Sequence, residues 1–183
     1  MSIKESTIWI ITGPFQVGKT YFCNNLINQA RARGYKLAGM FCPPVFVNQV
    51  KTAITIEDLQ THERKTLATK RTTETRGLLT DHWVFDEEVM LWANQSLANA
   101  NNCDILLIDE LGPLEFNRGQ GWQNGLLAIE NGDYKIAVVI IRPVLVETAL
   151  KRWPKAKVFE LSARLTEVET SNQIEKILSE IDR

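Results

Sequence analysis

The sequence lacks several features that mark specialised classes of protein. Its longest uninterrupted apolar run, residues 136–141, is far too short to span a bilayer. The opening residues, MSIKE, lack the apolar core of a secretory signal. Only three cysteines occur, far apart at positions 23, 42 and 103, which argues against both a disulfide framework and a cysteine-based metal site. We therefore expect a cytoplasmic protein with reduced thiols and no membrane contact.

An excess of charge of either sign is also missing. The chain has 21 Lys and Arg against 22 Asp and Glu, for a net charge of −1, so nothing predicts bulk attraction to nucleic acid or an anionic membrane. Hydrophobic residues make up 44% and charged residues 23% of the sequence, which is ordinary globular composition. We expect one domain over residues 1–183, large enough to bury a substantial core.

A glycine-rich stretch near the N-terminus carries the strongest functional signal. Residues 13–20, GPFQVGKT, lie between an apolar run at 8–11 and a helix-like stretch at 19–33, which is the setting of a phosphate-binding loop. Glycines let successive N–H groups turn toward an anion, and the helix start adds further donors. We expect Lys19 to reach the β- and γ-phosphates and the Thr20 hydroxyl to bind Mg²⁺. The expected nucleotide contacts are Gly13, Pro14, Phe15, Gln16, Val17, Gly18, Lys19, Thr20 and Tyr21.

A pair of acids follows a second apolar run. Residues 105–108, ILLI, end in Asp109 and Glu110. A carboxylate at the carboxyl end of a buried strand would face Mg²⁺, so we expect Asp109 on the metal side. A second carboxylate beside it can orient and partly deprotonate a water for attack on the γ-phosphate, the role we expect of Glu110. Alone this pattern is weak, but together with the loop at 13–20 it indicates a nucleotidase.

The remaining pattern predicts an α/β fold. Strands are expected at 8–11, 35–41, 105–108, 136–141 and 158–161, and helices at 19–33, from Asp86, at 122–132, 144–153 and 174–181. Buried strands that alternate with amphipathic helices favour a mostly parallel sheet with helices on both faces. Alternating residues at 52–56 and an extended piece at 65–69 predict a β-hairpin within an insertion of about 44–82.

Several arginines are candidates to stabilise charge on the transferring phosphoryl group. Arg142 directly follows a buried strand, and Arg118 lies in the loop after the acid pair. Either could equally form a structural ion pair. Residues 60–81 are the most polar and basic of the chain, consistent with a solvated hairpin and loop or with a flap that brings an arginine to the phosphates.

The two motifs together resemble the thermophile-type (cancer-related) nucleoside-triphosphatase family. The resemblance is carried by GPxxxGKT, a hairpin, and residues 104–115, DILLIDELGPLE, and it extends roughly over residues 7–160. It implies a cytosolic P-loop enzyme of the additional-strand, RecA-like class that hydrolyses nucleoside triphosphates to the diphosphate and phosphate, with loose base preference. It also implies that 13–20 is the nucleotide loop, Asp109 the Mg²⁺-side acid and Glu110 the base. Segments 72–83 and 116–122 match only loosely, so no arginine or base-reading residue is carried over.

Two alternative functions remain open at this level. A small-molecule or nucleotide kinase would share the loop and use an arginine-rich lid, which the 60–81 segment could supply. A nucleotide-binding adaptor or switch would bind without appreciable turnover. The guanine-reading Asn-Lys-x-Asp and the transporter Leu-Ser-Gly-Gly-Gln are both absent. Nothing in the sequence points to a particular protein partner.

Overall fold

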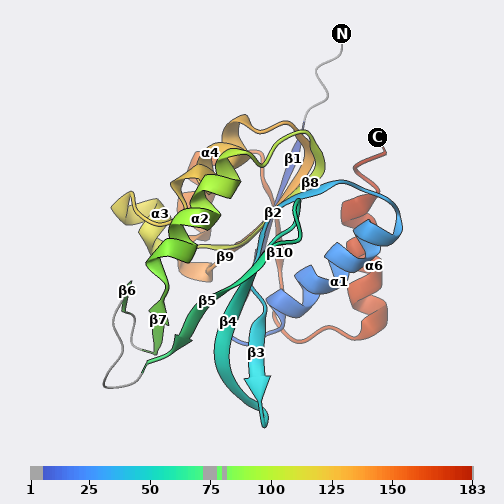
Figure 1. Ribbon diagram of the computed structural model, residues 1–183. Coiled ribbons are helices and arrows are strands. Elements are labelled where there is room, and N and C mark those ends of the chain that lie inside the picture. The colour runs from blue at the N-terminus through green and yellow to red at the C-terminus, as the bar shows by residue number, and fades with distance from the viewer. Residues whose placement is uncertain (1–5, 72–77, 80–81, 183) are drawn as a thin grey trace.

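The fold is a mixed sheet with helices on both faces (Figure 1). The computed structural model describes residues 6–71, 78–79 and 82–182. The strands are β1 Thr7–Thr12, β2 Leu37–Phe41, β3 Pro44–Val47, β4 Val50–Asp58, β5 Arg64–Lys70, β6 Leu78–Leu79, β7 Trp83–Phe85, β8 Cys103–Leu111, β9 Tyr134–Ile141 and β10 Lys157–Glu160. The helices are α1 Lys19–Ala32, α2 Glu87–Ala98, α3 Pro113–Arg118, α4 Gln123–Asn131, the 3-10 turn η1 Pro143–Leu145, α5 Val146–Arg152 and α6 Glu167–Leu178.

The sheet has a parallel half and an antiparallel half. Its strand order is β10-β1-β9-β8-β2-β4-β5-β7-β6, with β3 paired to β4. Strands from β10 to β2 run parallel to their neighbours, whereas β4 joins β2 in antiparallel fashion and begins the second half. The predicted parallel sheet is therefore confirmed around β1 and β8. Strand β9 lies between those two motif strands, as the additional-strand class requires.

Side-chain alternation divides the core between the two faces of the sheet. On one face Ile105 and Leu107 of β8 pack with Leu26 of α1 and Ile177 of α6. On the other face Leu106 and Ile108 pack with the buried side chains of α2, α4 and α5. Because β1, β8 and β9 are covered on both sides, their sequences are continuous apolar runs rather than alternating ones.

The predicted hairpin forms and belongs to a larger antiparallel extension. Strands β4 and β5 pair with Ile54 opposite Ala68 and Ile56 opposite Lys65, with a bulge between Ile54 and Thr55. Strand β3, which the sequence did not suggest, pairs with β4 around a tight turn at Asn48 and Gln49. Both turn residues have positive φ, at 49° and 65°, as a two-residue hairpin turn requires.

Helix ends agree with prediction where local side chains determine them. Asp86 caps α2 and accepts a hydrogen bond from the Val89 amide at 3.1 Å, and Gly132 follows the last turn of α4. The last helix begins earlier than its apolar repeat suggested, at Glu167, because Thr166 and Glu169 form a capping box. None of the described helices has the length and apolar character needed to cross a membrane.

Candidate nucleotide-binding site

The loop at residues 13–18 leaves the carboxyl end of β1 and leads directly into α1. Its shape depends on two glycines with positive φ, Gly13 at 143° and Gly18 at 109°. A Cβ added at Gly13 would lie 2.3 Å from the carbonyl oxygen of Leu161, so only glycine fits between the loop and the end of β10. Helix α1 starts after Gly18 with no side-chain cap and no acid in its first turn. No side-chain cap or first-turn carboxylate therefore binds the N-terminal amides of α1, which are free to bind an anion.

Lys19 folds back over this loop. Its ammonium donates to the carbonyl oxygens of Gly13, at 2.7 Å, and Pro14, at 2.8 Å. Burial lowers the pKa of Lys19, and the carboxylates of Glu110 and Asp109 oppose that change. The lysine thus lies at the loop, within the electrostatic reach of both acids.

The acid pair lies in a β-bulge at the carboxyl end of β8. The pairing with β9 shifts between Ile108 and Leu111, and Glu110 adopts a left-handed backbone with φ of 72°. Such a conformation costs energy for a residue with a side chain and commonly occurs at functional sites. The bulge changes the direction of the strand at the point where Asp109 and Glu110 face the loop.

Asp109 is buried and incompletely compensated. It is 6% exposed, and its Oδ2 accepts a hydrogen bond of 3.0 Å from the Cys42 amide at the end of β2. Burial raises the pKa of the Asp109 carboxyl to about 7, against that hydrogen bond and with support from the negative charge of Glu110. Nearby cations lower the pKa of Asp109 too little to restore its ordinary value.

Glu110 is engaged by Arg142. The Arg142 Nε donates to Glu110 Oε1 in an ion pair between partly exposed side chains. Arg142 follows β9, the strand between the two motif strands, so it reaches the same sheet edge as the loop. The structure therefore brings together Lys19, Asp109, Glu110 and Arg142. Arg118 lies elsewhere, exposed in the last turn of α3, and no contact joins it to the acid pair among the described residues.

The other predicted loop residues lie at the surface of the same site. Phe15 is 84% exposed at the apex of the loop. Tyr21 is on the exposed face of the first turn of α1, with the Arg164 guanidinium 5.5 Å from its ring centroid. The Thr20 side chain is half-buried beside Lys19. The GPLE part of the second motif has a structural role, since Glu115 accepts hydrogen bonds from the amides of Gly112, at 2.8 Å, and Trp122, at 2.9 Å.

Sequence reasoning missed three contributors to this edge. They are the Cys42 amide, the Arg164 side chain, and Lys51 at the start of β4. Each comes from a segment far from both motifs, and no local pattern distinguishes it. The only feature of the sequence that could have indicated Lys51 is that it is a basic residue directly before the predicted strand at 52–56.

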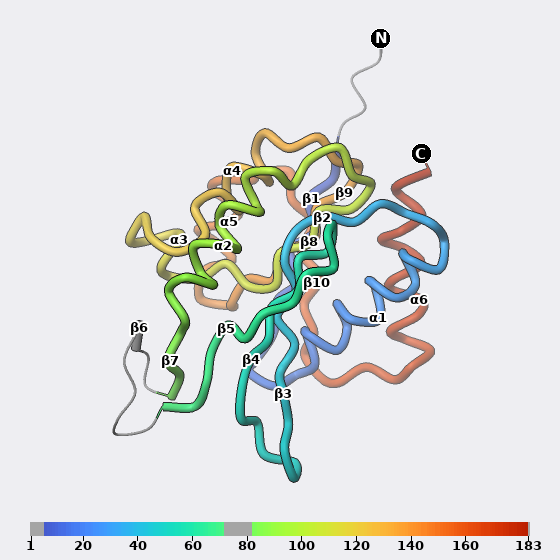
Figure 2. The backbone as a smooth tube through the Cα atoms, viewed as in Figure 1, coloured from blue at the N-terminus to red at the C-terminus, as the bar shows by residue number. Residues whose placement is uncertain are grey.

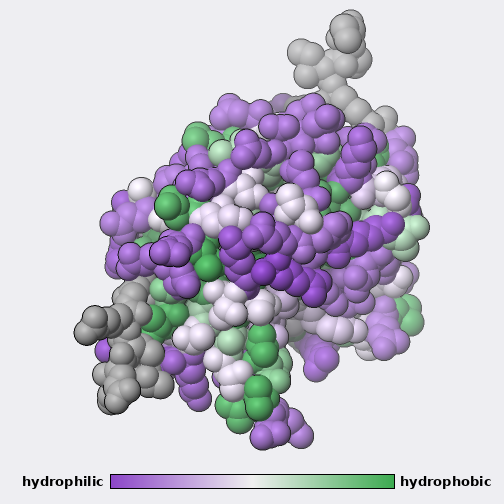
Figure 3. All heavy atoms as spheres, in the orientation of Figure 1, coloured by the Kyte–Doolittle hydropathy of each residue, from purple (hydrophilic) through white to green (hydrophobic). Residues whose placement is uncertain are grey.

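The β3–β4 hairpin extends the carboxyl edge beyond the start of α1 (Figure 2). Apolar side chains gather on its outer part (Figure 3), where Phe46 is 60%, Val47 54% and Val50 50% exposed. The hairpin thus forms an apolar projection on the side of the sheet from which the loop departs.

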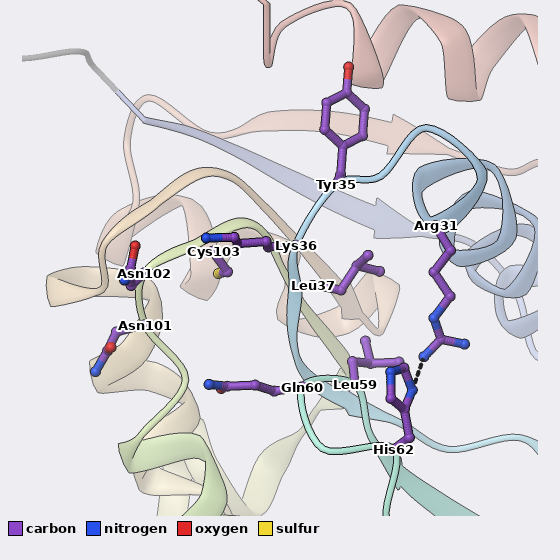
Figure 4. Close-up of a pocket in the computed structure, with 10 residues that line it drawn as sticks. All are labelled: Arg31, Tyr35, Lys36, Leu37, Leu59, Gln60, His62, Asn101, Asn102 and Cys103. Atoms are coloured by element: carbon purple, nitrogen blue, oxygen red, sulfur yellow. Dashed lines mark hydrogen bonds between the residues drawn. The ribbon is translucent and has the colours of Figure 1, made fainter.

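A separate hollow of about 260 Å³ lies at the opposite edge of the sheet. Figure 4 shows it between the start of β2, the start of β8 and the β4–β5 turn. Among the residues that line it, Arg31 contacts His62 Nδ1 at 3.0 Å, and Arg31 also contacts Glu57, which lies outside the lining, at 2.7 Å. Arg64 also pairs with Glu57, so this arginine of the predicted flap serves the turn and not the loop. Arg76 and the rest of 72–77 lie outside the described residues.

Comparisons with known proteins agree with this arrangement. A family model described as NTPase matches residues 8–177. Nucleoside-triphosphatase THEP1 of Saccharolobus solfataricus is 36% identical over 112 residues, which cover 61% of this chain and 63% of that protein. The matched region therefore spans less than two thirds of that relative. The protein of the same name from Sulfolobus acidocaldarius is 26% identical over 144 residues, 73% of this chain and 76% of the relative.

Two solved structures share the fold. The solution structure of a human cancer-related nucleoside triphosphatase has a TM-score of 0.68 at 18% identity and covers 96% of both chains. The crystal structure of THEP1 from Aquifex aeolicus has a TM-score of 0.63 at 20% identity, with 97% of this chain and 100% of that chain covered. At these identities the likeness establishes the architecture alone.

Proposed function

Because the chain belongs to the NTPase family, whose model matches residues 8–177, we propose that it hydrolyses nucleoside triphosphates to the diphosphate and phosphate. The loop at 13–18 and the start of α1 would hold the phosphates through backbone amides. Lys19 would turn from the carbonyl oxygens of Gly13 and Pro14 to the β- and γ-phosphates, which exchanges neutral acceptors for charged ones.

One observation carries this proposal most directly: the bulge that presents Asp109 and Glu110 to the loop. The charges of both acids act on Lys19, which supports a site shared by the acid pair and the loop. The left-handed backbone of Glu110 is a local cost that a simple strand end would avoid. A hydrolase needs a carboxylate at this position to orient water, whereas a plain anion-binding loop does not.

The residues at this edge fit a magnesium ion. Asp109 supplies a buried carboxylate and Thr20 a hydroxyl, both oxygen donors of the kind that Mg²⁺ prefers. Among the described residues no group of three or more His, Cys, Asp or Glu could hold a metal on its own. An ion held by Asp109 and Thr20 would therefore complete its shell with phosphate oxygens and water, as Mg²⁺ commonly does. Such an ion would neutralise charge on the phosphates during transfer.

We infer that Glu110 acts as general base once Arg142 releases it. While the ion pair persists, the guanidinium occupies Oε1 of the carboxylate that must accept a proton. A bound γ-phosphate offers Arg142 a more highly charged partner. Movement of Arg142 to that phosphate would free Glu110 and stabilise the charge that develops there. Substrate binding and base activation would then be coupled through one side chain.

The kinase alternative has less support than the sequence suggested. It relied on a basic lid from residues 60–81, but Arg64 is paired with Glu57 and Lys65 with Glu63. A nucleotide-binding switch remains the second candidate, since the Glu110–Arg142 pair would suit a slow enzyme. Appreciable turnover without an acceptor would distinguish the hydrolase from this switch.

The test is phosphate release from ATP and GTP with Mg²⁺ and no acceptor, for the wild type and Glu110→Gln. We expect the wild type to release phosphate. The variant should bind nucleotide normally and lose roughly 10²-fold or more in turnover, the scale of a general base. Glu147→Gln, an exposed change in α5, serves as the matched control. Normal turnover of Glu110→Gln would assign the base elsewhere. Diphosphate formation only when an acceptor is added, with the phosphoryl group on the acceptor and no free phosphate, would favour the kinase.

A further inference from the structure

Strand β4 brings a lysine to the edge of the sheet that carries the nucleotide loop. Lys51 is the second residue of β4, which begins after the β3–β4 turn and runs antiparallel to β2. The start of β4 therefore lies at the carboxyl edge of the parallel strands. Strand β2 reaches the acid pair at the same edge, because the Cys42 amide that follows it binds Asp109.

Among the described residues the Lys51 ammonium has an aromatic partner but no carboxylate within ion-pair distance. Its Nζ lies 4.7 Å from the centroid of the Trp83 ring on β7, and Lys51 forms no ion pair within the described part of the chain. Lys65 provides the contrast on the neighbouring strand. It lies 4.3 Å from the Trp92 ring and also pairs with Glu63 at 3.2 Å. Lys51 is the one of these two lysines whose positive charge has no anionic contact.

Lys51 is also close enough to the acid pair to interact with it. Burial lowers the pKa of Lys51, and the charges of Asp109 and Glu110 oppose that change. A half-buried ammonium beside an anion-binding loop is stabilised when an anion arrives.

We propose that Lys51 contacts the terminal phosphate of the bound nucleoside triphosphate, which makes the inserted hairpin part of the active site. The inference rests on the proposed function, since it names a further residue for the same reaction. Lys19 and the loop would hold the phosphates from the β1–α1 side, and Lys51 would add a cation from β4. A cation at this position stabilises charge on the phosphoryl group, the role that an arginine finger has in related chemistry.

A role at the terminal phosphate makes a specific prediction about nucleotide discrimination. Lys51→Met keeps most of the side-chain stem and removes the charge. We expect affinity for a non-hydrolysable triphosphate analogue to fall about tenfold or more, the scale of a hydrogen bond to a charged group. Affinity for the matching diphosphate should change less than about twofold, since no terminal phosphate is present to lose the contact. Turnover should fall together with triphosphate affinity.

The experiment is titration calorimetry with Mg²⁺ and the ATP and GTP analogues, then ADP and GDP, alongside phosphate release. Lys65→Met is the matched control and should change neither affinity nor turnover. Lys51→Arg should recover part of the triphosphate preference, and Lys51→Gln replaces the methionine variant if that one unfolds. Equal losses for triphosphate and diphosphate, or no loss for either, would overturn the role of Lys51 while wild-type turnover still upheld the hydrolase. A wild type that binds neither nucleotide would overturn the proposed function itself.

Discussion

Glu57 of β4 and Asp109 of β8 are both buried carboxylates, but the protein compensates their charges to very different degrees. Glu57, 4% exposed and opposite Phe41 in the β2–β4 pairing, binds Arg31 and Arg64, each at 2.7 Å. At the carboxyl edge Asp109 receives one backbone hydrogen bond from Cys42. Burial raises the pKa of both acids, but the arginines reverse the effect at Glu57, whose pKa lies below its ordinary value. The pKa of Asp109 stays raised, at about 7.

We interpret Glu57 as a structural charge and Asp109 as a charge that a ligand would compensate. Glu57 is compensated within the fold by two arginines. Asp109 lies among too few cations to restore its ordinary pKa, and Lys51 has no ion pair with any residue that the structure describes. A polyphosphate together with a divalent cation would supply both missing partners. The raised pKa of Asp109 therefore supports a ligand site at this edge, whereas among the described residues no such carboxyl group lines the hollow near the start of β2.

The largest expected effect concerns Lys19. Lys19→Ala removes the cation from the loop, and triphosphate affinity should fall roughly 10²-fold or more, because a hydrogen bond to a charged group is lost with its charge. Calorimetry with a triphosphate analogue measures it. Lys36→Ala, an exposed lysine near the amino edge, should bind normally. Equal affinities for all three proteins would show that the loop does not hold phosphate.

Asp109→Asn should change how stability depends on pH. The folded-state pKa of Asp109 is raised from 3.8 to about 7, so its contribution to stability is present below about pH 4 and is lost as pH rises through 7. Relative to Asp109→Asn, the wild type should therefore lose on the order of a few kcal/mol of unfolding free energy across that range. Denaturant titrations without nucleotide or metal measure it. A difference between the two proteins that is constant with pH would contradict the burial of an incompletely compensated acid.

Glu57→Gln tests the compensated carboxylate. The change leaves Arg31 and Arg64 without a carboxylate, and the unfolding free energy should fall by about 1–3 kcal/mol, while phosphate release is unaffected. Glu63→Gln, whose carboxylate is exposed, should cost less than about 0.5 kcal/mol. The idea of a purely structural cluster fails if Glu57→Gln folds normally and loses turnover.

Arg142→Ala should have the smallest effect on stability. Its side chain is 59% exposed in the pair with Glu110, which is 36% exposed, and exposed pairs contribute less than about 1 kcal/mol. Denaturant unfolding of the nucleotide-free protein measures it. A loss as large as that of Glu57→Gln would mean that this pair supports the fold instead of serving the reaction.

Sequence patterns predicted much of the fold. The strands at β1, β8 and β9, the α1 helix, the β4–β5 hairpin and the Asp86 cap were all readable, because each depends on contiguous apolar runs, periodicity or a local hydrogen bond. Strand β3 was not predicted because it has only four residues and its turn, Asn48-Gln49, contains no glycine. Helix α3 was not predicted because it has only six residues. The start of α6 at Glu167 was misplaced since the apolar repeat begins a turn after the cap.

The sequence by itself determined the chemistry that contiguous residues can perform. A phosphate loop uses backbone amides and one lysine from a single stretch, and an acid pair follows its own strand, so both are visible without a fold. Only the tertiary structure decided which distant groups complete the site: the Cys42 amide, Arg142 against Glu110, and Lys51 near both acids. These groups come from separate strands, and the order of strands in the sheet, which side-chain spacing does not encode, brings their ends to one edge.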